Sequence, residues 1–207
     1  MITALKLFRF LGPTLLFFGT FVVLPPLLMS YFSGTLDVVL FSIYLVCIGY
    51  SVLVLLTLRK RKFSYSPRDG FIITFVTWVF ISLLASVPFI SNNVNFFDAF
   101  FEAVSGLTTT GSTVLSDLNG FSEYMLMYRQ LLQWAGGVGL VIVVLAIIPA
   151  VSGGMKVLQA ETSGFADKSF SPRLRETARS LLKFYLAITA LCVLSYWFVG
   201  MNWFEAF

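Results

Sequence analysis

Long apolar runs constrain this chain more than any other feature of its sequence. Five of them stand out, at Phe10–Tyr31, Leu36–Leu58, Phe71–Ile90, Tyr124–Val151 and Leu181–Met201. A helix of about 20 apolar residues spans a hydrocarbon core of about 30 Å. Hydrophobic residues make up 58% of the 207 residues and charged residues only 12%, whereas soluble domains are about 25% charged. The sequence therefore predicts an all-α integral membrane protein with several spans.

The basic residues indicate how these spans are oriented. Of the 14 lysines and arginines, all except Arg129 lie before the first run, between the second and third, or from the end of the fourth to the start of the fifth. Because basic residues are retained on the cytoplasmic side, we expect a cytoplasmic amino terminus. Most acids, including Asp98 and Glu102, then fall outside, where they would raise the local cation concentration. This distribution holds only if residues 96–114 enter the membrane from outside and return to the outside.

A short apolar stretch, Phe96–Leu107, leads into the uncharged sequence GLTTTGSTV, Gly106–Val114. Asn95 is a favourable N-cap, and a helix of about a dozen residues reaches only about 18 Å, too short to cross the bilayer. The chain beyond it must return as non-helical backbone, which is tolerated at membrane depth only where it is buried in protein or lines a water-filled path. We therefore expect a re-entrant pore helix and filter loop. An ordinary external turn is the alternative for the string taken alone.

The chemistry of the loop suits a cation. Gly111 permits a positive φ, so that successive carbonyl groups can turn to one side, and neutral oxygens can replace the hydration shell of an ion. The end of the short helix would add partial negative charge, and the loop itself holds no fixed charge. The candidate ion ligands are Thr109, Thr110, Gly111 and Ser112, with Thr108 and Thr113 as flanking support.

Arg129 lies near the outer end of the fourth run and is followed by Gln130 and Gln133. We interpret Arg129 as a brace that pairs with an outer acid or with a carbonyl of the filter loop. The alternative is an interfacial arginine that extends to the lipid headgroups.

The sequence also contains an internal echo. VNFFDAF at Val94–Phe100 recurs as MNWFEAF at Met201–Phe207, and a span preceded by SPR lies upstream of each. The pattern predicts a helix pair over residues 1–62, a first pore repeat over 63–155, a cytoplasmic connector over 156–180 and the start of a second repeat over 181–207. One repeat cannot enclose a pore, so we expect the amino-terminal portion of a longer protein with three further filter strands.

Four segments together resemble the TrkH/TrkG branch of the Trk/Ktr potassium uptake transporter family: DAFFEAVSGLTTTGSTVL, YRQLLQWAGGVGLVIVVLAIIPA, SGGMKVLQAETSG and SPRLRETARSLLKFYL. The resemblance covers essentially the whole chain. It implies potassium-channel-like repeats, each a span, a re-entrant pore helix with its filter loop and a second span, preceded by an extra pair of transmembrane helices. It also implies direct potassium contact at Thr109 and Thr110, a homodimer in the bacterial inner membrane and a cytosolic nucleotide-binding TrkA-type regulatory subunit.

The function expected from these features is potassium uptake by a pore-forming subunit. Potassium channels have two glycines in their TVGYG strand and this chain has one, so a less selective pathway for potassium and sodium is an alternative. A non-conducting fragment or assembly subunit is another. An enzyme is not expected, because the chain has no histidine, no acid pair within a span and no nucleophile elbow. Neither an organic cofactor nor a nucleic-acid partner is expected.

Overall fold

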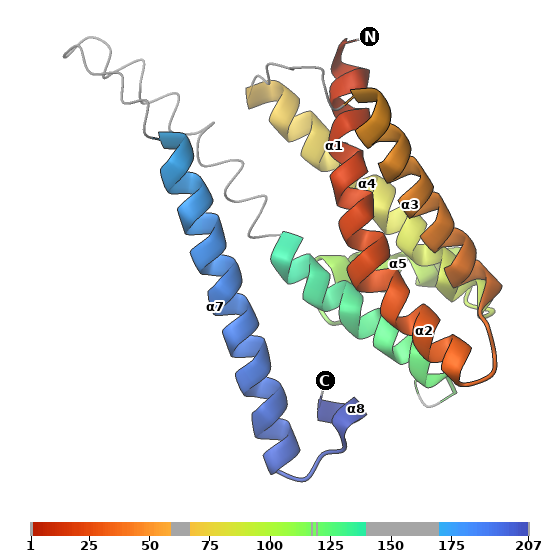
Figure 1. Cartoon of the computed structure of the whole chain (residues 1–207). Coiled ribbons are helices and arrows are strands. Elements are labelled where there is room, and N and C mark those ends of the chain that lie inside the picture. The colour runs from red at the N-terminus through yellow and green to blue at the C-terminus, as the bar shows by residue number, and fades with distance from the viewer. Residues whose placement is uncertain (1, 59–66, 117, 119, 140–169, 207) are drawn as a thin grey trace. The chain divides into compact units, whose positions relative to one another are not determined.

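The computed structural model describes residues 2–58, 67–116, 118, 120–139 and 170–206. Every regular element in these ranges is a helix (Figure 1): α1 (Ile2–Phe18), η1 (Gly19–Val23), α2 (Leu24–Phe32), α3 (Val38–Leu58), α4 (Pro67–Ser91), α5 (Phe96–Leu107), α7 (Phe170–Phe198), α8 (Trp203–Ala206) and one further helix over residues 123–139. The chain divides into two compact units, Met1–Gly137 and Val138–Phe207.

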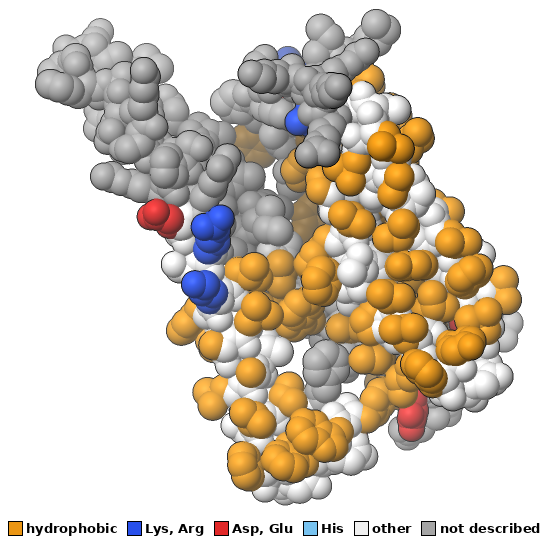
Figure 2. Space-filling model, viewed as in Figure 1, with side chains coloured by type: hydrophobic (Ala, Val, Ile, Leu, Met, Phe, Trp, Pro, Cys, Tyr) orange, Lys and Arg blue, Asp and Glu red, His pale blue; other side chains and the backbone are white. Residues whose placement is uncertain are grey.

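Four helical stretches within the described residues are long and apolar enough to cross a membrane: Ala4–Phe32, Val38–Leu58, Arg68–Ser91 and Arg179–Phe198. The predicted all-helical, multi-pass membrane protein is therefore confirmed. The end of the predicted fourth run and most of the predicted connector lie outside the described residues. Figure 2 shows hydrophobic side chains over most of the described helices on the face in view, as a lipid-facing surface requires.

The first span is a continuous helical stretch, Ala4–Phe32, although it contains prolines. Pro13 lies inside α1, and Pro25 follows the π-helical turn η1, in which the amide of Leu24 donates to the carbonyl of Gly19. Proline lacks an amide hydrogen and its ring clashes with the carbonyl four residues earlier. A wider π turn just before the prolines accommodates both problems without ending the helix.

Small residues bring α1 and α3 close together. A Cβ atom on Gly12 would lie 2.6 Å from Val54, and one on Gly19 would lie 2.9 Å from Cys47. The hydroxyl of Ser51 donates to the carbonyl of Gly12 at 2.8 Å. Close backbone approach and a side-chain hydrogen bond are the usual means of joining helices in lipid, so α1 and α3 form a firmly packed pair.

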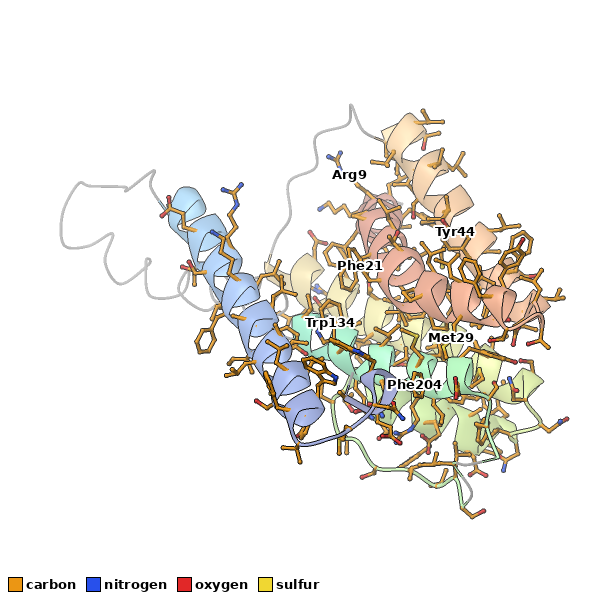
Figure 3. All side chains as sticks on the ribbon, turned by 60° about the horizontal axis from the view of Figure 1, so that its bottom comes forward. Arg9, Phe21, Met29, Tyr44, Trp134 and Phe204 are labelled. Atoms are coloured by element: carbon orange, nitrogen blue, oxygen red, sulfur yellow. The ribbon has the colours of Figure 1, made fainter. Side chains whose placement is uncertain are left out.

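Basic side chains join three helix ends at one end of the first unit. Arg9, labelled in Figure 3, donates to the carbonyl of Leu58 at 3.0 Å, and Lys6 forms an ion pair of 2.8 Å with Asp69. Arg9 thereby supplies positive charge at the carboxyl end of α3, where the helix dipole favours it. The start of α1, the end of α3 and the start of α4 thus meet at the end to which the sequence assigns the cytoplasm.

The second unit repeats the backbone geometry that follows α4. Asn93 and Gly200, which are equivalent in the internal echo, both have positive φ, 65° and 106°. The amide after each donates to a carbonyl five positions earlier, Val94 to Phe89 and Met201 to Tyr196. Asn95 caps α5 and Asn202 caps α8, each through its side-chain oxygen. The sequence echo therefore corresponds to a recurring local structure.

Candidate functional site

The short helix α5 has the bounds that the sequence predicts. The side chain of Asn95 accepts hydrogen bonds from the amides of Phe97 and Asp98 at 3.0 and 3.1 Å, and the helix ends at Leu107 after 12 residues. At 1.5 Å per residue it is about 18 Å long. It is therefore too short to cross a bilayer.

The helix over residues 123–139 runs parallel to α5. Glu102 contacts Arg129, Gly106 faces Leu132, and the carbonyl of Leu107 lies where a Cβ on Gly136 would be, at 2.2 Å. These contacts advance together along the two helices, so both helices begin at the same end of the unit. The segment between them must return to that end.

The return begins along α5 itself. The carbonyl of Ser112 accepts from the hydroxyl of Ser105 at 2.6 Å, and the amide of Val114 donates to Glu102, further back along the helix, at 2.8 Å. Residues 108–115 contain no helix. The chain thus leaves the end of α5 and returns along it as non-helical backbone, the local geometry predicted for a re-entrant segment, and Figure 3 shows part of this connection as a loop outside the helices.

The first residues of the loop turn sharply over the end of α5. The amides of Thr108, Thr109 and Thr110 donate to carbonyls of the last helical turn, those of Val104, Gly106 and Ser105 respectively, at 2.8 to 2.9 Å. These carbonyls are therefore used within the protein. The end of α5, where the sequence predicts partial negative charge near the ion, is thus hydrogen-bonded to the loop.

Backbone handedness alternates along the loop. Gly111 has φ 73°, as the sequence predicts, and Thr109 has φ 57°, whereas Thr110 between them is not in the positive region. Alternation of this kind allows successive peptide groups to face the same way. Nothing in the sequence indicates Thr109, because β-branched residues rarely adopt a positive φ.

Three consecutive carbonyl oxygens of the loop are unpaired. Within the described part of the chain, those of Thr108, Thr109 and Thr110 accept no hydrogen bond, whereas the carbonyls of Gly111 and Ser112 accept from Arg129 at 3.4 Å and from Ser105 at 2.6 Å. All five residues are exposed. The loop therefore has a free stretch available to a ligand and an anchored stretch after it.

The threonine hydroxyls are ordered by the same turn. Thr108 Oγ1 donates to the carbonyl of Val104 at 2.8 Å and lies 2.8 Å from Thr110 Oγ1. A hydroxyl has one hydrogen to donate, so Thr110 must be the donor between the two threonines. The lone pairs of Thr110 Oγ1 are then left for another partner.

Arg129 forms both contacts expected of a brace. Its Nε donates to Glu102 Oε2 at 2.9 Å, and its Nη2 donates to the carbonyl of Gly111 at 3.4 Å. Glu102 and Arg129 are both buried. Arg129 therefore contacts the loop directly, at the carbonyl of Gly111, and indirectly, through Glu102.

Glu102 does not lie exposed at the membrane surface, as was expected of the outer acids. The residue as a whole is 1% exposed, and its Oε1 accepts from Thr113 Oγ1 at 2.6 Å and from the amide of Val114. The returning loop covers the face of α5 from which Glu102 projects, so the carboxylate meets peptide and hydroxyl donors in place of water. A signal existed in the sequence: one acid and one arginine, each within an apolar helix, require partners.

Of the flanking residues, Thr113 lies against Glu102 and Thr108 against the end of α5. Ser105, which the sequence did not single out, anchors Ser112. Gly136 packs against the carbonyl of Leu107.

Comparison with known proteins supplies the family. Residues 37–207 match the TrkH family, described as a cation transport protein. The chain is 34% identical over 203 residues to the Trk system potassium uptake protein TrkH of Escherichia coli K12, covering 96% of this chain and 42% of that protein. It is 37% identical over 204 residues to TrkH of Halomonas elongata, with 96% and 42% covered.

A solved structure agrees with these relatives. The crystal structure of the potassium transporter TrkH from Vibrio parahaemolyticus matches with a TM-score of 0.77 and 31% identity, over 98% of this chain and 41% of that one. The chain spans about 42% of the length of the relatives named here. The chain belongs to the TrkH family of cation transport proteins.

Proposed function

We propose that the complete protein is the pore-forming subunit through which a bacterium takes up potassium across its inner membrane. The observation that carries the proposal is the run of three unpaired carbonyls, Thr108 to Thr110, on a loop whose next two carbonyls are anchored. The names of the relatives, which are potassium uptake proteins, support potassium as the ion.

In the proposed mechanism the ion exchanges part of its hydration shell for neutral oxygens of the loop. The carbonyls of Thr108, Thr109 and Thr110 and the lone pairs of Thr110 Oγ1 are the ligands that one repeat contributes. Gly111 and Ser112, predicted from the sequence as ligands, would then act through backbone conformation and anchoring. Because the charges of Glu102 and Arg129 offset each other, this pair adds no net charge beside the loop, and transport involves no covalent step.

The proposed orientation places the loop on the outer half of the membrane and the amino terminus in the cytoplasm, which the basic residues at the start of α1 and α4 support. The relatives are named as parts of a Trk system. We extend this to a homodimer with a cytosolic nucleotide-binding TrkA-type subunit as the partners of the complete protein.

Growth and ion flux test the proposal. The complete protein, expressed in bacteria that lack their own potassium uptake systems, should restore growth at low potassium and should take up potassium and rubidium in preference to sodium. Protein that reaches the membrane but restores neither growth nor uptake would contradict the proposal. The single glycine of the loop favours the second candidate, a less selective cation pathway, and equal uptake of potassium and sodium would establish it.

A further inference from the structure

The ion pair between Glu102 and Arg129 is the most deeply buried charged group among the described residues. The Glu102 side chain has an exposed fraction of 0% and that of Arg129 11%, and their closest atoms are 2.9 Å apart. Burying two charges is costly unless their remaining hydrogen-bonding groups are also satisfied. The remaining hydrogen-bonding groups of Glu102 and Arg129 therefore need partners within the protein.

Among the described residues, every other side-chain hydrogen bond of the pair goes to the loop. Glu102 accepts from Thr113 Oγ1 and from the amide of Val114, and Arg129 donates to the carbonyl of Gly111. The contacts begin directly after the three free carbonyls. Of the described loop residues upstream of Gly111, none forms a hydrogen bond with either side chain of the pair.

We propose that Glu102 and Arg129 are positioning residues that set the selectivity of the loop between potassium and sodium. The inference rests on the function proposed for the loop. By fixing Gly111 to Val114, the pair holds the peptide groups of Thr108 to Thr110 at one spacing, and the spacing and number of coordinating carbonyls govern the choice between the two ions.

Other anchors of the loop are few. Backbone hydrogen bonds to α5 end at the amide of Gly111, whose bond to Ser105 is 3.4 Å long. Beyond that point the described contacts with α5 come from the side chains of Ser105 and Glu102. Removal of the pair leaves Ser105 to hold this part of the loop alone, so the free carbonyls gain room to move.

The pair acts through position rather than charge. It is neutral as a whole, and loss of one partner would leave a net charge that attracts or repels potassium and sodium alike. The informative variant is therefore a double one, Glu102→Leu with Arg129→Met. It keeps the net charge and much of the volume, and apolar replacement of a buried ion pair is often tolerated.

The experiment measures two properties of the complete protein. One is the ratio of potassium to sodium uptake in cells that lack other uptake systems. The other is the extra thermal stability that potassium gives the purified protein over sodium, since an ion bound by the folded state raises its melting temperature. The matched control is Glu123→Leu with Arg68→Met, which makes the same changes at exposed positions.

The double variant should lower the potassium-to-sodium uptake ratio about tenfold, the effect of losing one hydrogen bond to a charged group. Its potassium-specific stabilisation should disappear, and the control should resemble the parent. A folded double variant with the parental ratio would overturn the proposal, and so would an equal loss of potassium and sodium uptake, which indicates a structural role only.

Thr113→Val covers the case in which the double variant does not fold. It removes one donor to Glu102 at an exposed residue and keeps the side-chain shape, and it should lower the ratio about threefold, about 0.65 kcal/mol. A parental ratio in this variant would then overturn the proposal.

Failure of the proposed function has a different signature. A parent that takes up no potassium, yet is stabilised by potassium specifically and loses this effect in the double variant, contradicts the uptake function and supports the positioning role. A parent with neither property contradicts both.

Discussion

At the scale of single residues, backbone conformation and hydroxyl direction prepare the loop after α5 for a cation. Thr109 and Gly111 adopt positive φ, and the Thr108 hydroxyl, bound to Val104, directs the hydrogen of Thr110 toward itself. Each effect leaves oxygen lone pairs, rather than hydrogens, free for a ligand. The arrangement is local, since it depends on the last turn of α5 and a few residues beyond it.

Replacement of Gly111 by alanine should alter selectivity at a modest cost in stability. An added Cβ would meet nothing within 4 Å, but φ is 73°, and an L-residue in that region costs about 1–2 kcal/mol. The backbone can relieve this strain by rotating, which moves the carbonyls on either side. We expect a lower potassium-to-sodium uptake ratio in flux assays.

Gly34 provides the matched control, because its φ is 78° and a Cβ there is equally unobstructed, while it lies in the turn between α2 and α3. Gly34→Ala should lower the melting temperature to a similar extent and leave the ion ratio unchanged. An equal change of the ion ratio in both variants would show that general destabilisation is responsible.

The Thr110 hydroxyl should matter to the ion more than its methyl group does. Thr110→Val removes the oxygen whose lone pairs are free, and Thr110→Ser retains it. We expect the valine variant to bind potassium about tenfold more weakly, about 1.4 kcal/mol, and the serine variant to bind like the parent. Potassium-dependent melting of the purified protein measures both, and equal weakening in the two variants would assign the role to the methyl group.

The sequence predicts the helix and loop that form this site better than it predicts the contacts of the buried side chains. Asn95 and Gly111 are local signals, and they predicted the start of α5 and the positive φ of the loop. The burial of Glu102 depends on which face of α5 the returning loop covers, a tertiary relation that charge counting along the chain does not contain. Arg129 was predicted as a brace because Gln130 and Gln133 extend a polar stripe on its helix, but the identity of its partner required the structure.

At the scale of elements, α5 and the 123–139 helix are joined so closely that one residue decides their spacing. The peptide carbonyl of Leu107 occupies the space that a side chain on Gly136 would need, at 2.2 Å. The end of the helix, and with it the first residue of the loop, is therefore positioned by a backbone contact. Tyr128 on the 123–139 helix donates to the carbonyl of Ala85 on α4 at 3.1 Å. This hydrogen bond joins α4 to the pair formed by α5 and the 123–139 helix.

Gly136→Ala should consequently destabilise the protein by about 3 kcal/mol, the upper part of the range for overpacking. The clash is with backbone, which cannot rotate away, so the two helices must separate. Gly49→Ala in α3 serves as the control, since its Cβ would meet nothing within 4 Å and alanine favours a helix. Thermal melting in detergent compares them, and equal stability of the two variants would contradict the close contact.

At the scale of the whole molecule, hydropathy predicted the spans but not the full length of their helices. The run Phe10–Tyr31, predicted as one span, lies within the continuous stretch Ala4–Phe32, in which the π turn of η1 precedes Pro25 and Pro26. Likewise α7 begins at Phe170, eleven residues before the predicted run, because charged residues such as Glu176 and Arg179 favour a helix as well as leucine does. Apolar content marks the membrane-embedded part of a helix and leaves its ends undetermined.

The parallel course of α5 and the 123–139 helix leads to a prediction about topology. Ser91, at the end of α4, and Glu123, at the start of the next long helix, should lie on the same side of the membrane, because α5 is too short to cross it and the loop returns along α5. Arg68, at the start of α4, should lie on the other side. Single cysteines at these three exposed positions, in a background in which Cys47 and Cys192 are replaced by alanine, report the arrangement.

A membrane-impermeant maleimide should label Ser91→Cys and Glu123→Cys in intact spheroplasts and Arg68→Cys only after permeabilisation. The physical basis is the matched depth of the contacts: Glu102 and Arg129 each lie six residues from the start of their helices, about 9 Å along each axis. If Ser91→Cys and Glu123→Cys were labelled from opposite sides, residues 96–122 would cross the bilayer. The unpaired carbonyls of Thr108 to Thr110 would then lie in a segment that crosses the hydrocarbon core, where unsatisfied backbone groups are too costly to persist. That labelling result would therefore contradict both the re-entrant topology and the assignment of these carbonyls as ion ligands.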